Sequence, residues 1–242
     1  MAIALVQEKT NSQSTSETAT TIDVVLDATA TAGNLLITAC STDKDAVSWT
    51  PPSGFTIMDP YNGISVSLAM AWKVAAGGEQ TITWTSSIEE HNAWVGEYSG
   101  LTSTPFDVKA AANSAETDVA AQTSGTTGTT AQNDELAVAA FAVDSASIGG
   151  TTGYSNGFTE KAAVTDINSG NSVLWVATKV LTATGTVETT LTITGGGSDQ
   201  MAGQVATFKA DTGGPPETAS VLLKSGIRAG AVGAGGLRVV TA

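Results

Sequence analysis

The sequence predicts an all-β protein built from two tandem antiparallel β-sandwiches and an extended C-terminal arm. Each sandwich, of jelly-roll or immunoglobulin-like type, would hold about seven strands. The first observation is composition: the chain has 38 threonines, whereas charged residues make up 14% and aromatic residues 5%. Threonine suits a half-solvated pleated face because its branched Cβ is stiff and its hydroxyl hydrates the outer surface. The other two observations are short alternating segments and an internal repeat.

The internal repeat divides the chain into similar halves. Gly54-Phe55-Thr56 matches Gly157-Phe158-Thr159. Further matches pair 33–37 with 133–138, 80–85 with 189–194, and 93–98 with 203–208. The offset grows from about 100 to 110, as expected when insertions accumulate in loops. We therefore predict a first sandwich over residues 1–104 and a second over residues 105–210. The same strands would also fit one larger merged sandwich.

Short strands are predicted between turn signals, and several of them alternate apolar and hydroxyl side chains, as in Thr81-Ile82-Thr83-Trp84-Thr85. Turn signals such as Pro51-Pro52-Ser53-Gly54, Asn62-Gly63 and Gly149-Gly150 separate these segments, and no sustained 3.6-residue apolar stripe occurs. The predicted strands of the first half are 3–8, 21–27, 34–41, 54–59, 64–75, 79–86 and 92–101. Those of the second half are 106–112, 117–124, 135–144, 158–164, 172–181, 188–194 and 202–210.

Residues 211–242 are predicted to form a docking arm. This stretch contains seven glycines and no aromatic residue, so it cannot build its own core. It begins with the linker Asp211-Thr212-Gly213-Gly214-Pro215-Pro216. Its apolar and basic segments are candidates for adding strands to the sheet edge of a partner, in cis or in trans. The predicted docking residues are Val221, Leu222, Leu223, Arg228, Leu237, Arg238, Val239 and Val240.

The charge distribution bears on the partners. The net charge is −13, which argues against nucleic-acid binding because phosphate contacts rely on lysine and arginine. Residues 1–210 carry a net charge of −14 and residues 211–242 a net charge of +1. The slightly basic end could dock on an acidic surface, while the acidic body is equally explained as ordinary solubility charge.

The residues favour a protein that is not an enzyme and that has no cofactor and no metal. Cys40 and His91 are the only residues of their types, and no catalytic or phosphate-binding motif occurs. Cys40 is expected in the core and His91 in a solvated loop. The acidic pairs Asp43 with Asp45 and Asp134 with Glu135 are candidate calcium ligands, but surface loop charge is the preferred interpretation because neither pair lies in an alternating oxygen-ligand loop. The chain shows no signal peptide and no apolar span of about 18 residues, so we expect synthesis as a soluble cytoplasmic protein.

Aromatic residues in or beside loops are candidates for glycan contact, since aromatic rings stack on sugar faces. A role in the core or in anchoring loops is the competing interpretation. The tryptophans within strand patterns, Trp72, Trp84, Trp94 and Trp175, are expected to pack inside the protein. The possible glycan contacts are Trp49, Phe55, Tyr61, Tyr154 and Phe158.

The segments AGNLLITA, PPSGF, AWKVAAGGEQTITW and EYSGL, in this order, resemble a family of tandem β-sandwich proteins of tailed bacteriophages and prophages. The resemblance covers about residues 30–210. Phe55 stands where the family usually has tryptophan, and the second half reads Tyr154-Ser155-Asn156-Gly157 in place of the PPSG turn. These motifs are structural, so the resemblance implies no catalytic residues in this chain.

The resemblance implies a structural virion protein: a capsid decoration protein, a head fibre or a tail-associated protein. Its partners would be other capsid or tail proteins and copies of itself, with no nucleic acid and no membrane. It would be located in the virion after synthesis in the host cytoplasm. The alternative is a glycan-binding adhesion module that contacts surface polysaccharide.

Overall fold

A computed structural model describes residues 1–13, 19–43, 47–63, 65–87, 90–114, 120–144, 150–165, 172–194 and 200–213. Within these ranges the chain forms fifteen strands and no helix, so the predicted all-β class is confirmed. No described segment is a helix long and apolar enough to cross a membrane. Residues Met1–Thr212 form one compact unit.

The first seven strands come from the first half of the repeat and the remaining eight from the second half. The first seven are β1 (Ala4–Gln13), β2 (Thr21–Val25), β3 (Leu35–Thr42), β4 (Thr56–Asn62), β5 (Ser67–Val74), β6 (Thr81–Thr85) and β7 (His91–Ser99). The others are β8 (Leu101–Asn113), β9 (Ala121–Thr123), β10 (Glu135–Asp144), β11 (Gly150–Tyr154), β12 (Thr159–Thr165), β13 (Ser172–Val180), β14 (Thr190–Thr194) and β15 (Gln200–Ala210).

The two halves share one strand order. The first half forms a five-stranded sheet, β1-β7-β3-β5-β4, and the second forms β8-β15-β10-β13-β12. The remaining strands form the pair β2-β6 in the first half and the sheet β9-β14-β11 in the second. All strand pairs are antiparallel. The sequence repeat therefore corresponds to a repeated topology, with β11 as an extra strand.

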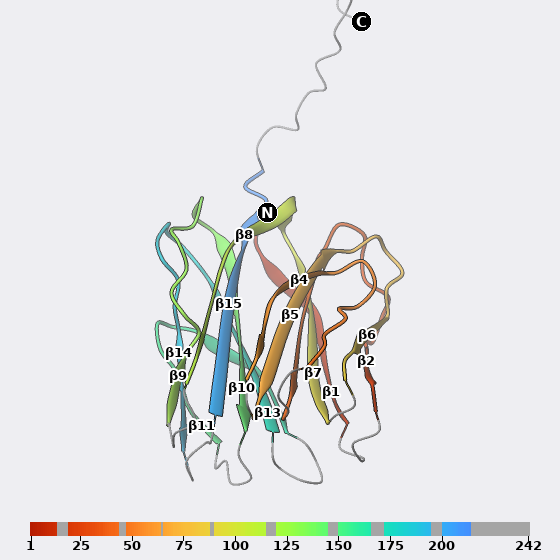
Figure 1. Ribbon diagram of the computed structural model, residues 1–242. Coiled ribbons are helices and arrows are strands. Elements are labelled where there is room, and N and C mark those ends of the chain that lie inside the picture. Colours follow the sequence, from red (N-terminus) through yellow and green to blue (C-terminus); the bar gives the residue numbers. More distant parts are fainter. Residues whose placement is uncertain are drawn as a thin grey trace, which may run out of the picture. The chain divides into compact units, whose positions relative to one another are not determined.

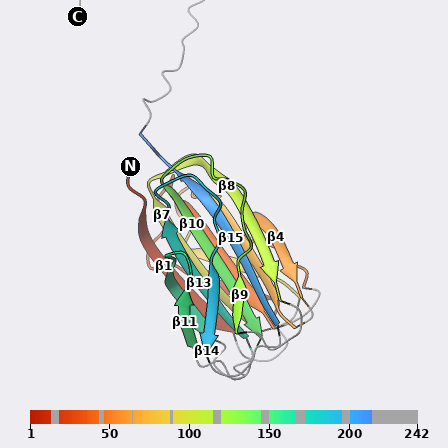
Figure 2. The same ribbon diagram turned by 90° about the vertical axis from the view of Figure 1, so that its left-hand side faces the viewer.

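The sheets stack as layers, with the two five-stranded sheets in the middle (Figure 1). The β2-β6 pair covers the outer face of one, and the β9-β14-β11 sheet covers the outer face of the other. Figure 2 looks onto this last sheet, with β13, β10, β15 and β8 behind it. The central strands of the two middle sheets, such as β3 and β10, therefore have covered faces on both sides, whereas the edge strands β1, β4 and β12 are partly exposed.

Burial on both faces explains the continuous apolar runs in the central strands. In β3, Leu35 and Ile37 belong to the core between the two five-stranded sheets, whereas Leu36 belongs to the core under β2-β6. In β10, Leu136 and Ala137 divide in the same way between the central core and the core under β9-β14-β11. A strand buried on both faces needs apolar residues at consecutive positions, not at alternate ones.

The largest group of buried apolar residues lies between the two halves. It brings together residues such as Leu35, Met70 and Trp94 from the first half with Val138, Leu174 and Phe208 from the second. Trp72, which is partly buried, packs on this core and stacks on Phe106 with a ring-centroid separation of 5.8 Å. The halves are thus joined through a shared hydrophobic core.

Polar contacts also cross between the halves. The Asp59 carboxylate pairs with the Lys109 ammonium at 2.6 Å, and this contact lowers the pKa of Asp59. Gln204 Nε2 donates to the Asp59 carbonyl at 2.7 Å, and Asn92 Nδ2 donates to the Ser172 carbonyl at 3.1 Å. These bonds fix the alignment of one five-stranded sheet on the other.

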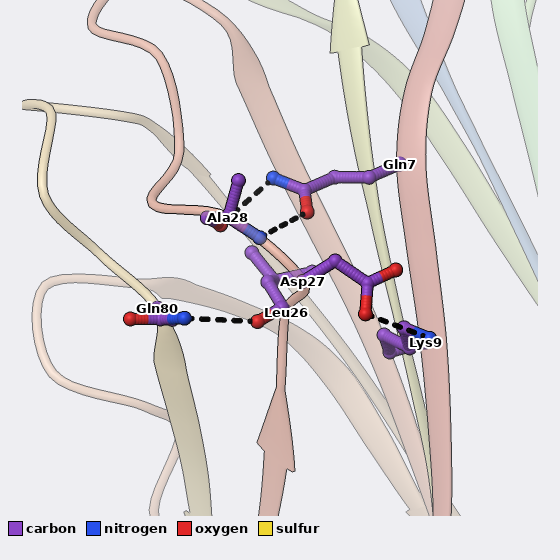
Figure 3. A network of polar contacts seen from close by, with 6 residues as sticks. All are labelled: Gln7, Lys9, Leu26, Asp27, Ala28 and Gln80. Carbon is purple, nitrogen blue, oxygen red and sulfur yellow. Dashed lines mark hydrogen bonds and ion pairs between the residues drawn. The ribbon is translucent and has the colours of Figure 1, made fainter.

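The outer β2-β6 pair is tied to the edge strand β1, as Figure 3 shows. Gln7 binds the Ala28 backbone twice, donating to the carbonyl at 3.0 Å and accepting from the amide at 3.2 Å. The Lys9 ammonium lies 3.0 Å from the Asp27 carboxylate, and Gln80 Nε2 donates to the Leu26 carbonyl at 3.2 Å. The outer pair is thus held by side-chain contacts at its end as well as by its buried face.

Two features of the strand pattern differ from expectation. Strand β11 was not predicted, because its sequence Gly-Thr-Thr-Gly-Tyr lacks apolar alternation and begins at an apparent glycine turn. The predicted boundary between the halves, after residue 104, lies inside β8, which starts at Leu101 opposite Ala210. Only Gly100, with φ +81°, separates β7 from β8. A side chain at this position would collide with the Ala2 carbonyl, so glycine is required.

Candidate functional site

The two ends of the compact unit meet at one end of the molecule. The Met1 ammonium donates a hydrogen bond to the Asp211 carbonyl, and the Asp211 amide donates to the Gly100 carbonyl at 2.8 Å. A surface groove of about 410 Å³ lies here. Its lining residues are Met1, Ala2, Ile3, Asp134, Val180, Ala210, Asp211 and Thr212. The predicted docking residues, from Val221 to Val240, lie outside the described residues.

Two of the predicted glycan contacts lie in the interior. Phe55 and Phe158 occupy the same turn in the two halves and are 8% and 7% exposed. Phe55 packs in the core under β2-β6, and Phe158 packs in the core under β9-β14-β11. Each ring thus packs on the core beneath the turn that carries it.

The other three rings are partly buried. The ring of Trp49 meets that of Trp84 edge-on with centroids 5.7 Å apart, and its Nε1 donates to Asn62 Oδ1 at 3.0 Å. Tyr61 packs against the central core. Tyr154 packs on Phe141 at a centroid separation of 6.1 Å, and its hydroxyl donates to the Glu160 carboxylate at 3.2 Å. Burial, with the Glu160 charge, raises the pKa of Tyr154.

A second surface groove, of about 470 Å³, has the side chain of Phe158 in its lining. It lies between the turn that follows β11, the end of β13 and the connection from β13 to β14. Its walls carry both charged and uncharged polar groups, and its apolar lining comes from the underlying core. The lining residues are Thr126, Asn156, Phe158, Lys179, Leu181, Thr186, Val187 and Glu188.

The polar walls of this groove are held by hydrogen bonds. The Lys179 ammonium donates to the Asn156 carbonyl at 2.7 Å, and Asn156 Nδ2 donates to the Glu188 carbonyl at 2.8 Å. The Thr126 hydroxyl donates to the Glu188 carboxylate. Asn156 and Gly157 both have left-handed backbone, with φ of +57° and +75°. Asparagine and glycine tolerate this conformation best, so the turn presents the Asn156 carbonyl to Lys179 without unusual strain.

Of the residues that line this groove, only Phe158 is a site candidate from the sequence. Lys179 and Glu188 were missed, although the repeat offered a signal for both. Lys179 corresponds to Lys73, and Glu188 corresponds to Glu79, so both half-repeats place a base and an acid beside the same aromatic turn.

Two polar residues expected at the surface are buried instead. His91 is the first residue of β7 and is 1% exposed, with its Nε2 within hydrogen-bond distance of the Ser86 hydroxyl. The expectation of a solvated loop was wrong because the strand starts one residue earlier than predicted. Glu135 has no exposed surface, since it begins β10 between β13 and β15. Its interpretation as surface loop charge was also wrong.

The other candidate nucleophile and metal-ligand residues are Cys40 and the acidic pair Asp43 with Asp45. Cys40 is fully buried, and burial raises the pKa of its thiol well above the usual value. Asp43 is partly buried, and Asp45 lies outside the described residues. Within the part of the chain that the structure describes, no three histidine, cysteine, aspartate or glutamate side chains gather as a metal site.

Comparisons of the chain with protein-family models, with curated proteins and with solved structures found no match.

Proposed function

We propose that the chain is a structural protein of a tailed-phage virion, in which two tandem sandwiches face outward from a capsid or tail surface. The single observation that carries this proposal is the meeting of Met1 with Asp211 at one end of the compact unit. Both ends of the folded body lie together, so attachment near either end leaves the rest of the body free to project.

Two further properties support a structural role. The halves share a core of closely packed small and large apolar residues, which favours a rigid body. The sequence that follows this body is glycine-rich and slightly basic, a composition suited to ordering on a partner surface. Capsid or tail proteins and further copies of the chain are the partners that this proposal requires.

A truncation tests the proposal. Removal of residues 213–242 leaves the compact unit intact, so the truncated protein should melt at the same temperature as the full chain but fail to co-purify with phage particles. The matched variant Arg228→Glu with Arg238→Glu keeps the length and reverses the basic charge of the segment. Equal incorporation of the truncated and full-length chains into particles would refute docking through this segment.

Adhesion to surface polysaccharide is the second proposed function, and the groove that Phe158 lines favours it. Its walls combine an ammonium, a carboxylate and hydroxyl groups above an apolar base. The test is a glycan array probed with full-length protein. Binding to one class of surface polysaccharide is expected, and a blank array would count against adhesion without affecting the structural proposal.

A further inference from the structure

The two halves offer an internal comparison of the same site. Lys73 pairs with Leu36 across β5 and β3, and Lys179 pairs with Ala137 across the corresponding strands β13 and β10. Glu79 directly precedes Gln80, whose carbonyl accepts from the Leu26 amide at 2.9 Å. Glu188 directly precedes Thr189, whose carbonyl accepts from the Ser124 amide at 2.8 Å. The base and the acid are therefore equivalent in the two halves.

In the first half the base, Lys73, and the acid, Glu79, form an ion pair and leave no groove between them. The Lys73 ammonium lies 2.7 Å from the Glu79 carboxylate, and both side chains are largely buried. The Glu79 carboxylate also accepts from the Ala76 and Gly77 amides at 2.9 Å each. Partial burial opposes ionisation of Glu79, but these hydrogen bonds outweigh it and lower its pKa to about 2. The ammonium of Lys73 also lies 6.0 Å from the centre of the Phe55 ring and so covers the aromatic turn.

In the second half the equivalent residues do not pair with each other. The Lys179 ammonium donates a hydrogen bond to the Asn156 carbonyl, and the Glu188 carboxylate accepts one from the Thr126 hydroxyl. The connection explains this difference: five residues separate Lys73 from Glu79, whereas eight separate Lys179 from Glu188. In the longer connection the Gly185 carbonyl accepts a hydrogen bond of 3.0 Å from the Thr130 amide, and Glu188 forms its contact with Thr126 and not with Lys179. The groove occupies the space between Lys179 and Glu188.

The groups that the groove presents define the chemistry of a ligand. One base and one acid give no net charge, so neither an anion nor a cation is favoured. Lys179 is a donor and Glu188 an acceptor, and the hydroxyl groups of Thr126 and Thr186 serve as both. Phe158, Leu181 and Val187 supply apolar lining. A compact uncharged molecule with hydroxyl groups around an apolar ring matches this set, and the volume of about 470 Å³ admits one.

We infer that the groove between Lys179 and Glu188 binds a neutral sugar residue, and that the equivalent position in the first half does not. This inference deepens the adhesion proposal and depends on it. The ammonium and carboxylate would hydrogen-bond to sugar hydroxyls, while the C–H face of the ring would lie toward Phe158. The insertion in the second half would thus have converted an ion pair into a binding site.

The experiment is a titration of the full-length protein with neutral methyl glycosides, followed by NMR of the backbone amides. Methyl glucoside, methyl galactoside, methyl mannoside and methyl N-acetylglucosaminide serve as probes, with glycine betaine as a zwitterionic control. Saturable shifts are expected at the amides of residues 156–158, 179–181 and 186–188 with at least one glycoside. Glu188→Gln and Lys179→Met should each weaken this binding by about tenfold or more, as for a hydrogen bond to a charged group.

Matched variants in the first half complete the design. Glu79→Gln and Lys73→Met break the closed ion pair and should leave glycoside binding unchanged. Shifts induced by betaine but not by glycosides would overturn the ligand class, and the absence of any saturable shift would overturn the site. If the protein binds the glycan array and neither Glu188→Gln nor Lys179→Met reduces this binding, the adhesion proposal is retained and the proposed sugar site is refuted. A blank array would contradict both the adhesion proposal and the sugar site.

Discussion

Gln7 Nε2 donates a hydrogen bond of 2.6 Å to the carboxylate of Glu97, a side chain in β7 with no exposed surface. Glu97 also accepts from the Asn34 amide group at 2.6 Å and from the Thr31 backbone amide at 2.9 Å. The second half replaces this arrangement. The strand positions of Asn34 and Glu97 correspond to those of Glu135 and Thr207, and the buried acid of the second half, Glu135, interacts with Asp107 and Thr207. A buried carboxyl is thus kept in each half, but it comes from a different strand and has different neighbours.

Because Glu97 and Glu135 have different neighbours, we expect them to give opposite dependences of stability on pH. Burial tends to raise the pKa of Glu97, but the hydrogen bonds from Gln7, Thr31 and Asn34 outweigh it and lower the pKa below its usual value of 4.5. A carboxyl with a lowered folded-state pKa stabilises the protein above its unfolded-state pKa. This contribution should be lost as the pH falls below about 4.5. Melting temperatures of the natural protein and of Glu97→Gln, measured from neutral to acidic pH, should converge as the pH falls.

Glu135 should show the reverse behaviour. Burial raises its pKa above 4.5, and the neighbouring Asp107 carboxyl raises it further. Asp107 itself accepts a hydrogen bond of 2.7 Å from the Ala131 amide. Stability from a group with a raised folded-state pKa is complete below the unfolded-state pKa and is lost as the pH rises through the folded-state pKa. Asp107→Asn should therefore raise the melting temperature at neutral and alkaline pH and flatten its decline.

The reciprocal variant Gln7→Asp is the matched control for this prediction. It places an acid beside Glu97 and should introduce a decline of stability with rising pH that the natural first half lacks. Equal pH profiles for the natural protein and Asp107→Asn would contradict the interaction between Asp107 and Glu135.

A buried threonine links two tryptophans of the first half. Trp84 Nε1 donates to the Thr38 hydroxyl at 2.9 Å, and this hydroxyl donates to the Trp94 carbonyl at 2.7 Å. Thr38→Val keeps the shape of the side chain but leaves the buried Trp84 N–H group without an acceptor. We expect a loss of about 1–3 kcal/mol in the free energy of unfolding, measured by denaturant titration. Addition of Trp84→Phe should cost less in the Thr38→Val background than in the natural protein, and additive losses would contradict the linkage.

The shared core predicts that the first half does not fold as a stable monomer. A chain that ends at residue 104 exposes the face of the five-stranded sheet that carries Leu35, Ile37 and Met70, all nearly fully buried in the whole protein. We expect this fragment to aggregate or associate and to bind a hydrophobic dye, because exposed apolar patches of this extent favour association. Size-exclusion chromatography and dye fluorescence provide the measurement, with residues 1–212 as the control. A monodisperse fragment with cooperative unfolding would show that the halves are independent.

The sequence was sufficient to predict the β class, fourteen of the fifteen strands in outline, and the repeat, because these follow from local alternation, turn residues and order along the chain. The consecutive apolar residues from Leu35 and from Leu136 lie in strands that the structure buries on both faces. Their two different cores were not predictable, because local patterns do not state which sheets face each other. The burial of Glu135 was missed for the same reason, whereas the burial of His91 was missed because the predicted strand began one residue too late. Likewise, lysine occupies the equivalent position in β5 (Lys73) and in β13 (Lys179). Local sequence does not state whether this lysine pairs with the glutamate that follows it, because the pairing depends on the path of the connection between them.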